Sequence, residues 1–370
     1  MNVSVLSLGG EELARLIAEP TWSFNEVLAA TQEQGALAVG TRGRILHGSL
    51  CLTAGASLAD IGVTAGSQLT LVVLPPLRIL TASSDESAKL WSATSGECLR
   101  SFEGHGAPVY SAGFSPDGQE VLTASCDCSA KLWSATSSEC ICSFEGHGGP
   151  VHSAGFSPDS QKVLTASHDR LAKLWSATSG KCLRSYEVHG SSVYSAVFSP
   201  TGQEMLTASD DRSAKLCSAV SGECIRTFEG HGGPVLSGVF SPDCREVLTA
   251  SWDRSAKLWS ATSGQCIRTF EGHRAPVLSG VFSPDGQQVL TASHDRSAKL
   301  WSATSGECLR SFEGHGASVL SAVFSPEGQE VLTASHDHSA KLWSTASGKC
   351  IRTFEGHGAP VRSAVFSPVG

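Results

Sequence analysis

Histidine and aspartate, the residue types that commonly act as a general base and its orienting partner, recur at a fixed spacing along this chain. The stretch TASHDRSAKLW at residues 291–301 returns 42 residues later as TASHDHSAKLW, and near-copies precede it at 42-residue steps. Nearly every copy carries a Gly-His pair and an aspartate in a turn. A catalytic His–Asp set would occur once, so seven regularly spaced sets indicate a structural role.

The other candidates for chemistry are weaker. His294 and His336 fall at equivalent positions of neighbouring repeats, but the only further ligand of that type in this position is the distant His168. We find no unpaired nucleophile–base set, no Gly-rich phosphate loop after a strand and no isolated carboxylate pair. The sequence therefore predicts no enzymatic activity, no metal and no cofactor.

Thirteen cysteines could suggest disulfides until they are placed. No CxxC pair offers metal spacing, and equivalent positions of successive repeats are poor partners for a bridge. We expect buried free thiols in a reducing compartment, with Cys126/Cys128 and Cys140/Cys142 as the close pairs. Seven cysteines share one repeat position: Cys98, Cys140, Cys182, Cys224, Cys266, Cys308 and Cys350.

Composition bounds the class of protein. The chain has 370 residues, 41% of them hydrophobic and 17% charged, and a formal net charge of −8. Acidic charge argues against general affinity for nucleic acid, whose phosphates need basic surface. The sequence contains no run of 18 apolar residues and no recognisable secretory signal, so we expect a protein of the cytoplasm or nucleus without membrane association.

Four short strands are predicted within each 42-residue period, which runs seven times from residue 77 to 370. In one period, PVYSAGFS and EVLTAS flank the turn PDGQ, and SAKLWS and CLRSF flank ATSGE. Apolar and β-branched segments between turn residues are typical of strands. Four strands every 40–45 residues favour a propeller blade over a helical solenoid.

From residue 77 onward the chain resembles the WD40-repeat β-propeller family, through its Gly-His pairs, SPDG turns, an aspartate before the third strand and a tryptophan ending KLW. It departs from the family in reading WS where the family reads WD. The resemblance implies a mainly β, seven-bladed propeller whose C-terminal strand completes the first blade.

The resemblance also implies a buried tetrad in each blade. One set would be His105, Thr123, Asp127 and Trp133, and the set joining the two ends of the ring would be His357, Thr81, Asp85 and Trp91. In one blade Val188 replaces the glycine and Cys217 replaces the tryptophan. Because that tetrad lacks its indole, we expect this blade to be the least stable.

Residues 1–74 carry no repeat. MNVSVLSLGGEELARL predicts a hairpin with a Gly-Gly turn, and Ser23 with Glu26 predicts a capping box for a helix that ends at Gly35. The order of elements resembles the α+β ubiquitin-like (β-grasp) fold, joined to the propeller by a Pro-Pro linker at 75–76. Leu8, Leu46 and Val72 fall where that family binds partners, although they could equally be ordinary β-face residues.

Two positions vary among the seven repeats. The residue before the turn aspartate reads Ser84, Cys126, His168, Asp210, Trp252, His294 and His336. The second residue of the first strand reads Tyr110, His152, Tyr194, Leu236, Leu278, Leu320 and Arg362. Both lie near the end that the family calls the top face, where its members commonly bind partners. Trp252 and the three leucines would cluster beside a polar, aromatic sector formed by Tyr110, His152, His168, Tyr194 and Asp210.

These positions suggest a non-enzymatic adaptor that binds a protein or peptide client, because aromatic anchors ringed by polar groups favour such interfaces. Neutral drift among recent duplicates would produce the same variation. A non-catalytic subunit of a ubiquitin-pathway or signalling enzyme complex is the alternative, followed by an RNA-processing scaffold. We expect a monomeric propeller within a larger complex, whose binding changes as histidines 152, 168, 294 and 336 titrate near pH 6.5.

Overall fold

The computed structural model describes residues 1–35, 42–52, 56–74 and 76–368. They form two compact units, Met1–Leu77 and Arg78–Pro368. Of the predicted Pro-Pro linker, Pro75 lies outside the described residues. Within the described ranges, no helix is both long and apolar enough to cross a bilayer.

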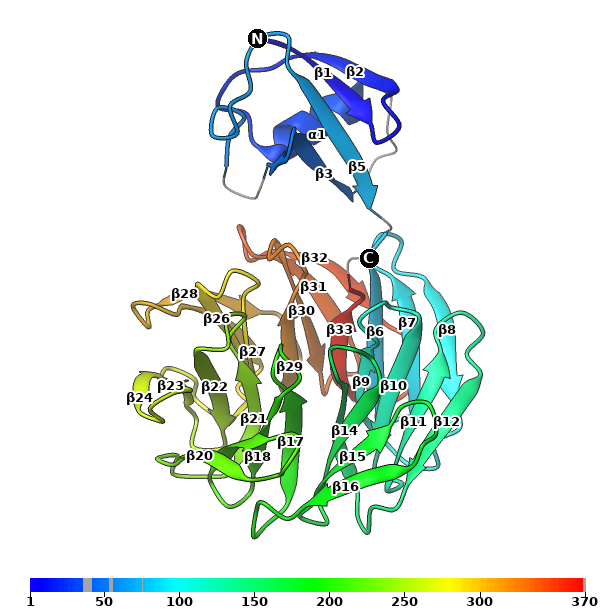
Figure 1. The fold of residues 1–370 in the computed structure, drawn as a ribbon, viewed down its shortest axis with the longest axis vertical. Helices are drawn as coiled ribbons and strands as arrows, with labels where there is room; N and C mark the ends of the chain where they lie inside the picture. The colour runs from blue at the N-terminus through cyan, green and yellow to red at the C-terminus, as the bar shows by residue number, and fades with distance from the viewer. Residues whose placement is uncertain (36–41, 53–55, 75, 369–370) are drawn as a thin grey trace. The chain divides into compact units, whose positions relative to one another are not determined.

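In its described residues, the N-terminal unit combines a mixed sheet with a single helix (Figure 1). The strand order is β2-β1-β5-β3-β4, in which β1 runs parallel to β5 and the other neighbours are antiparallel. Its described elements are β1 (Asn2–Ser7), β2 (Glu12–Ile17), α1 (Phe24–Glu33), β3 (Arg42–His47), β4 (Leu50–Cys51) and β5 (Gln68–Leu74).

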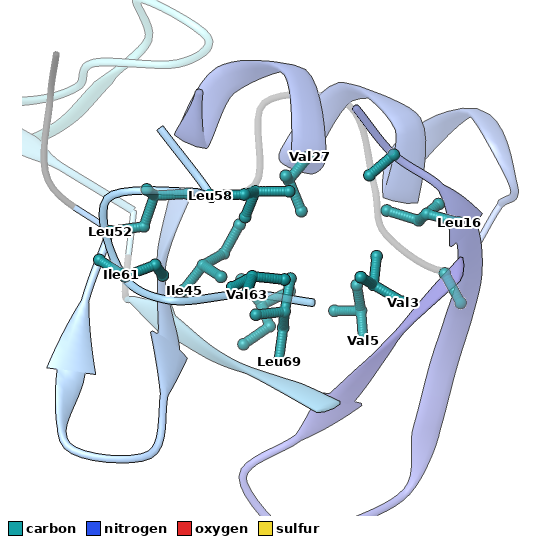
Figure 2. Packing of buried hydrophobic residues seen from close by; sticks show 13 residues of the cluster. Val3, Val5, Leu16, Val27, Ile45, Leu52, Leu58, Ile61, Val63 and Leu69 are labelled. Carbon is teal, nitrogen blue, oxygen red and sulfur yellow. The ribbon is translucent and has the colours of Figure 1, made fainter. Parts of the chain in front are cut away.

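Local sequence explains the helix and the core of this unit. The backbone N–H and the hydroxyl of Ser23 both donate to the Glu26 carboxylate, at 2.6 and 2.8 Å, and these bonds start α1. Gly35 follows the helix with a φ of 76°, a backbone conformation that favours glycine. Alternate strand residues such as Val5 and Leu69 pack against Val27 of α1 (Figure 2).

Within the described chain, the second unit contains seven four-stranded antiparallel sheets (Figure 1). The inner strands are β9 (Val109–Phe114), β13 (Val151–Phe156), β17 (Val193–Phe198), β21 (Val235–Phe240), β25 (Val277–Phe282), β29 (Val319–Phe324) and β33 (Val361–Phe366). The second strands are β6 (Arg78–Ser83), β10 (Glu120–Ser125), β14 (Lys162–Ser167), β18 (Glu204–Ser209), β22 (Glu246–Ser251), β26 (Gln288–Ser293) and β30 (Glu330–Ser335).

The remaining two strands of each sheet lie farther out. The third strands are β7 (Ser87–Ser92), β11 (Ser129–Ser134), β15 (Ala172–Ser176), β19 (Ala214–Ser218), β23 (Ala256–Ser260), β27 (Ser297–Ser302) and β31 (Ala340–Ser344). The outer strands are β8 (Cys98–Glu103), β12 (Cys140–Glu145), β16 (Cys182–Tyr186), β20 (Cys224–Phe228), β24 (Cys266–Phe270), β28 (Cys308–Glu313) and β32 (Cys350–Phe354). The prediction of four strands per repeat is confirmed.

The sheets follow one another in a closed ring. Each inner strand contacts the inner strand of the next sheet, and β33 contacts β9. The sheet β33-β6-β7-β8 is built from both ends of this unit, with Ala364 opposite Thr81. Hydrophobic clusters span neighbouring sheets; one joins Leu258 and Phe270 of one sheet to Val289 and Trp301 of the next. Because both sheet faces are covered, the second strands are buried almost throughout, including their threonine and serine residues.

The prediction of buried thiols is wrong for the repeated cysteines. All thirteen cysteines are free, but those at the shared repeat position are exposed, and Cys217 is the buried one. The shared position opens each outer strand, where a β-bulge interrupts pairing with the third strand, as between Leu90 and Trp91 opposite Cys98. The next residue is exposed as well; Leu99 is 46% exposed. A sheet edge faces solvent, and the repeat pattern does not reveal which strand forms it.

Candidate functional site

The repeated His–Asp sets are buried and hydrogen-bonded. Nδ1 of His105 lies 2.7 Å from Oδ2 of Asp127, and its Nε2 lies 2.8 Å from Oγ1 of Thr123. The indole N–H of Trp133 donates to that same hydroxyl oxygen at 2.8 Å. Burial lowers the pKa of His105. Burial alone would raise the pKa of Asp127, but hydrogen bonds from Ser129 and His105 bring it below its usual value.

The same geometry occurs around the ring. In the sheet built from both ends, His357 lies 2.7 Å from Asp85 and 2.8 Å from Thr81, to which Trp91 donates. Each histidine uses both ring nitrogens, so these sets stabilise the sheets and present no free base. Four further complete sets are His147/Thr165/Asp169/Trp175, His231/Thr249/Asp253/Trp259, His273/Thr291/Asp295/Trp301 and His315/Thr333/Asp337/Trp343.

The seventh set keeps its histidine and aspartate but has Cys217 in place of tryptophan. His189 still lies 2.7 Å from Asp211 and 2.8 Å from Thr207. The residues that pack around Cys217 differ as well. Cys217 packs with three residues that differ from their counterparts in the other sheets: Tyr186 for phenylalanine, Val188 for glycine and Met205 for valine or isoleucine. The expectation of a weakened sheet therefore does not follow from its packing.

The variable residue of each inner strand occupies a β-bulge. In the β9–β10 pair, Ala124 lies opposite Ser111 and Ser125 opposite Val109, which leaves Tyr110 outside the ladder. A bulged residue is directed differently from its neighbours. The same irregularity occurs at the equivalent residues of the other inner strands: His152, Tyr194, Leu236, Leu278, Leu320 and Arg362.

The variable turn residues lie at the same end of the sheets, because the start of each inner strand pairs with the end of the second strand. His168, Trp252, His294 and His336 are exposed there, whereas Asp210 is half-buried. Trp252 is 50% exposed, which is unusual for the largest apolar side chain. Its ring packs edge-on against His294, with centroids 5.5 Å apart.

Around part of the ring the inner-strand residues pack on one another and form an aromatic arc, comprising Arg362, Tyr110, His152 and Tyr194. The Arg362 guanidinium lies 5.5 Å above the Tyr110 ring. Tyr110 stacks on His152 at 5.4 Å, and His152 contacts Tyr194 at 5.1 Å. The Tyr194 hydroxyl donates to Asp210 at 3.4 Å. These side chains contact one another, so the arc is already ordered before any partner binds.

The opposite part of the ring is lined by a leucine arc, comprising Leu236, Leu278 and Leu320, all half-buried. These side chains occupy the same bulge positions, but they offer no polar group that could pair with a neighbour. Trp252 lies on the turn of the sheet that contributes Leu236. Apolar surface next to an exposed aromatic side chain is the composition found at the centre of protein interfaces.

The family described as the IFT122 first beta-propeller matches residues 76–280. The chain belongs to that family. WD domain, G-beta repeats match residues 264–302, 306–344 and 348–370, so the resemblance to WD40 repeats is confirmed. WD40 repeat-containing protein HOS15 of Arabidopsis thaliana is 49% identical over 45 residues. That segment covers 12% of this chain and 7% of the plant protein, so the chain matches only a small part of its relative.

On the top face of the propeller, the histidines do not form a uniform pH sensor. Burial, reinforced by His168, lowers the pKa of His152 to about 4. Its Nε2 is buried without a hydrogen-bond partner among the described residues. Burial, followed by repulsion from His336, also lowers the pKa of His294. The expectation that His152 and His294 gain charge near pH 6.5 is therefore wrong, because desolvation disfavours the imidazolium.

The described residues give no support for a metal site formed by these histidines. His294 is near His336, yet the described residues include no group of three or more His, Cys, Asp or Glu side chains able to hold an ion. His168 instead pairs with the Ser192 hydroxyl at 3.0 Å. Its neighbour Asp210 accepts a hydrogen bond from Ser191 at 3.0 Å.

In the N-terminal unit, Leu46 and Val72 share one face of the sheet, and Leu8 lies in a turn. Leu46 and Val72 alternate with core residues on adjacent strands, so they point away from the core. Leu8 follows β1, whose last residue lies beside β5 in parallel register, and it is 73% exposed. The structure thus places Leu46 and Val72 on the solvent side of β3 and β5, and Leu8 in an exposed turn after β1.

Sequence reasoning missed a third variable position, the residue after each turn aspartate. It has a left-handed backbone in every sheet, with φ between 68° and 75°. Four successive sheets carry an exposed arginine there: Arg170, Arg212, Arg254 and Arg296. The repeat alignment contained this signal, because the other three sheets have Glu86, Cys128 and His338 at this position.

Proposed function

We propose that this protein is a non-enzymatic scaffold or adaptor that binds a protein or peptide through the top face of a seven-bladed propeller at 77–370. WD40 propellers commonly bind protein partners, and families with this fold are generally non-catalytic scaffolds. The single observation that carries the proposal is the exposed Trp252 beside the half-buried leucine arc. An aromatic anchor bordered by apolar surface is typical of binding hot spots.

We further propose that residues 1–74 are a ubiquitin-like domain that acts as a second docking module. The strand order β2-β1-β5-β3-β4 and the helix between β2 and β3 support this assignment, because the resemblance predicts a β-grasp sheet. The shared sheet face of Leu46 and Val72, with Leu8 exposed in the turn after β1, supports partner binding by the module. The partners would include components of the ubiquitin system.

A pull-down with the full chain tests the proposal and separates it from the alternatives. Purified wild type, Trp252→Ala and Gln119→Ala would be immobilised and their bound proteins identified by mass spectrometry. Gln119 is the matched control, because it is exposed on a turn at the other end of its sheet. We expect Trp252→Ala to lose clients that Gln119→Ala retains, with a loss of ~2 kcal/mol or more in binding free energy.

The kinds of protein that are captured decide among the adaptor, enzyme-subunit and RNA-scaffold hypotheses. Clients of several kinds that depend on Trp252 would support an adaptor. One stable enzyme complex that is retained after Trp252→Ala would favour a non-catalytic subunit, and RNA-dependent capture would favour the RNA scaffold. Equal effects of the two substitutions would contradict the top-face assignment and leave drift as the reason for the variable positions.

A further inference from the structure

A charged patch borders the leucine arc on the turns that carry Trp252 and His294. Arg254 and Arg296 hold the left-handed position of these two turns, with φ of 73° and 71°. Arg274 lies in the loop before β25, at a position that is glycine in every other repeat. All three arginines are exposed. No other pair of neighbouring turns in the sequence combines three arginines with a tryptophan.

Hydrogen bonds and ring contacts bring these elements together. The backbone N–H of Arg274 donates to Oδ2 of Asp295 at 3.0 Å, and Asp295 lies between His294 and Arg296 in the chain. The Trp252 ring contacts His294 from the preceding turn. The arginine-bearing backbone and the exposed indole therefore occupy one continuous region of the top face.

The aspartates of these two turns are already engaged. Asp253 is paired with His231 at 2.7 Å, and Asp295 is paired with His273 at 2.8 Å. Each also accepts hydrogen bonds from a serine of its own turn, Ser255 and Ser297. The tetrads thus hold these two aspartates in place, and the exposed side chains of Arg254, Arg274 and Arg296 are available to an anion from outside.

We infer that the segment bound at the top face carries an anionic residue, a carboxylate or a phosphorylated side chain, next to an apolar residue. This inference rests on the proposed function. The apolar residue would contact Trp252 and the leucine arc, and the anion would meet Arg254, Arg274 and Arg296. Guanidinium groups bind carboxylate and phosphate oxygens in a bidentate manner. Because the protein carries a net charge of −8, a local cationic patch would also orient an acidic partner.

The test uses the full chain and fluorescein-labelled peptide libraries read by fluorescence anisotropy. Each library would have a fixed leucine followed by glutamate, phosphoserine, lysine or alanine, with randomised flanks. We expect the anionic libraries to bind at least tenfold more tightly than the lysine library, and this preference to shrink between 50 and 300 mM salt. Comparing glutamate with phosphoserine tells the two sources of negative charge apart.

Charge reversal provides the matched variants. Arg274→Glu and Arg254→Glu should each weaken the anionic libraries about tenfold and improve the lysine library. Arg170→Glu is the control, because Arg170 has the same left-handed turn position, with a φ of 75°, but follows His168 beside the aromatic arc. It should leave both libraries unchanged.

The failures are distinguishable. If Trp252→Ala abolishes binding while glutamate, phosphoserine and lysine libraries bind equally, the charge inference is overturned and the proposed function stands. If no library binds in a Trp252-dependent way, the proposed function itself fails. A labelled uridine 12-mer that binds more tightly than every peptide and is weakened by Arg274→Glu would overturn the inference in favour of single-stranded nucleic acid.

Discussion

The β17-β18-β19-β20 sheet and its six counterparts differ in the residues that pack at the position of the tetrad tryptophan. Elsewhere a glycine precedes the tetrad histidine and faces a tryptophan ring; a Cβ on Gly272 would meet Cη2 of Trp301 at 3.3 Å. That glycine also has a φ of 141°, which other residues rarely adopt. Where Cys217 replaces the tryptophan, Val188 replaces the glycine.

The difference shows that these positions act as a set. Met205 lies directly across from Cys217, where Val289 lies across from Trp301. Tyr186 is larger than the phenylalanines at its position, and its hydroxyl donates to the Ala219 carbonyl at 2.5 Å. The protein interior tolerates changes of shape when total volume is kept. Substituting one member alone should therefore be worse than either natural combination.

The largest effect should follow from copying Cys217 into a regular sheet. Trp301→Cys removes a buried indole that packs on Phe270 and donates to Thr291, with no compensating residue nearby. We expect a loss of ~3–5 kcal/mol in stability. Thermal melting of the full chain, with hydrogen exchange over 277–313, measures it. A loss below 1 kcal/mol would show that the indole contributes little to stability, and it would contradict the conclusion that these positions act as a set.

The reverse substitution should also destabilise. Cys217→Trp inserts an indole into space already taken by Tyr186, Val188 and Met205, and overpacking typically costs ~1–3 kcal/mol. Adding Val188→Gly, Tyr186→Phe and Met205→Val should recover the loss. The four stabilities would come from melting temperatures of the wild type and of the single, triple and quadruple variants. Additive effects would contradict the coupling, since residues in contact should not behave independently.

A smaller effect isolates one compensating contact. Tyr186→Phe keeps the ring but removes the hydrogen bond to Ala219, so we expect a loss of ~1 kcal/mol. Phe144→Tyr is the matched control in a regular sheet, because its ring packs on Trp175. Hydrogen exchange of residues 214–219 reports the local change. An unaltered rate in Tyr186→Phe would mean that the hydroxyl is dispensable.

The smallest difference in stability between the β17–β20 sheet and the other sheets should appear when the pH is lowered. Burial lowers the pKa of His189 and of His315, so the unfolded chain binds protons that the fold excludes. Stability present above pH 6.5 is therefore lost as the pH falls. A second loss should begin below about pH 4, since hydrogen bonds from Ser339 and His315 outweigh burial and hold the pKa of Asp337 at about 2. The Cys217 sheet should lose exchange protection in parallel with the β29–β32 sheet.

The repeat pattern predicted the four strands of each sheet well, because alternating apolar residues, turn residues and a fixed period are local properties. It predicted the exposure of cysteines poorly. Cys98 and Cys217 have the same thiol side chain. Cys98 is exposed at a bulge where an outer strand begins, whereas Cys217 is buried in a hydrophobic cluster. Burial depends on what the next sheet places against a residue, and a single repeat does not contain that neighbour.

The candidate site shows the same limit. Comparing repeats identified His152 and Trp252 as variable, but not that His152 is enclosed by Tyr110 and Tyr194 while Trp252 remains half exposed. His152 contacts Tyr110 and Tyr194, which hold the same position in the repeats before and after it. Its charge state and accessibility therefore depend on the identity of those neighbours.

The sequence by itself determined the repeat length, the strands within each repeat and the acidic net charge, because all of these follow from residue types and their spacing. The residues of the His–Asp–Thr sets were implied by the resemblance to WD40 repeats. The tertiary structure alone decided that the bulged inner-strand residues meet around the ring, that His152 is desolvated, and that Val188, Tyr186 and Met205 occupy the place of one indole. The reason is physical. Desolvation and packing energies depend on atoms brought together from different repeats, and those atoms become neighbours only when the sheets close into a ring.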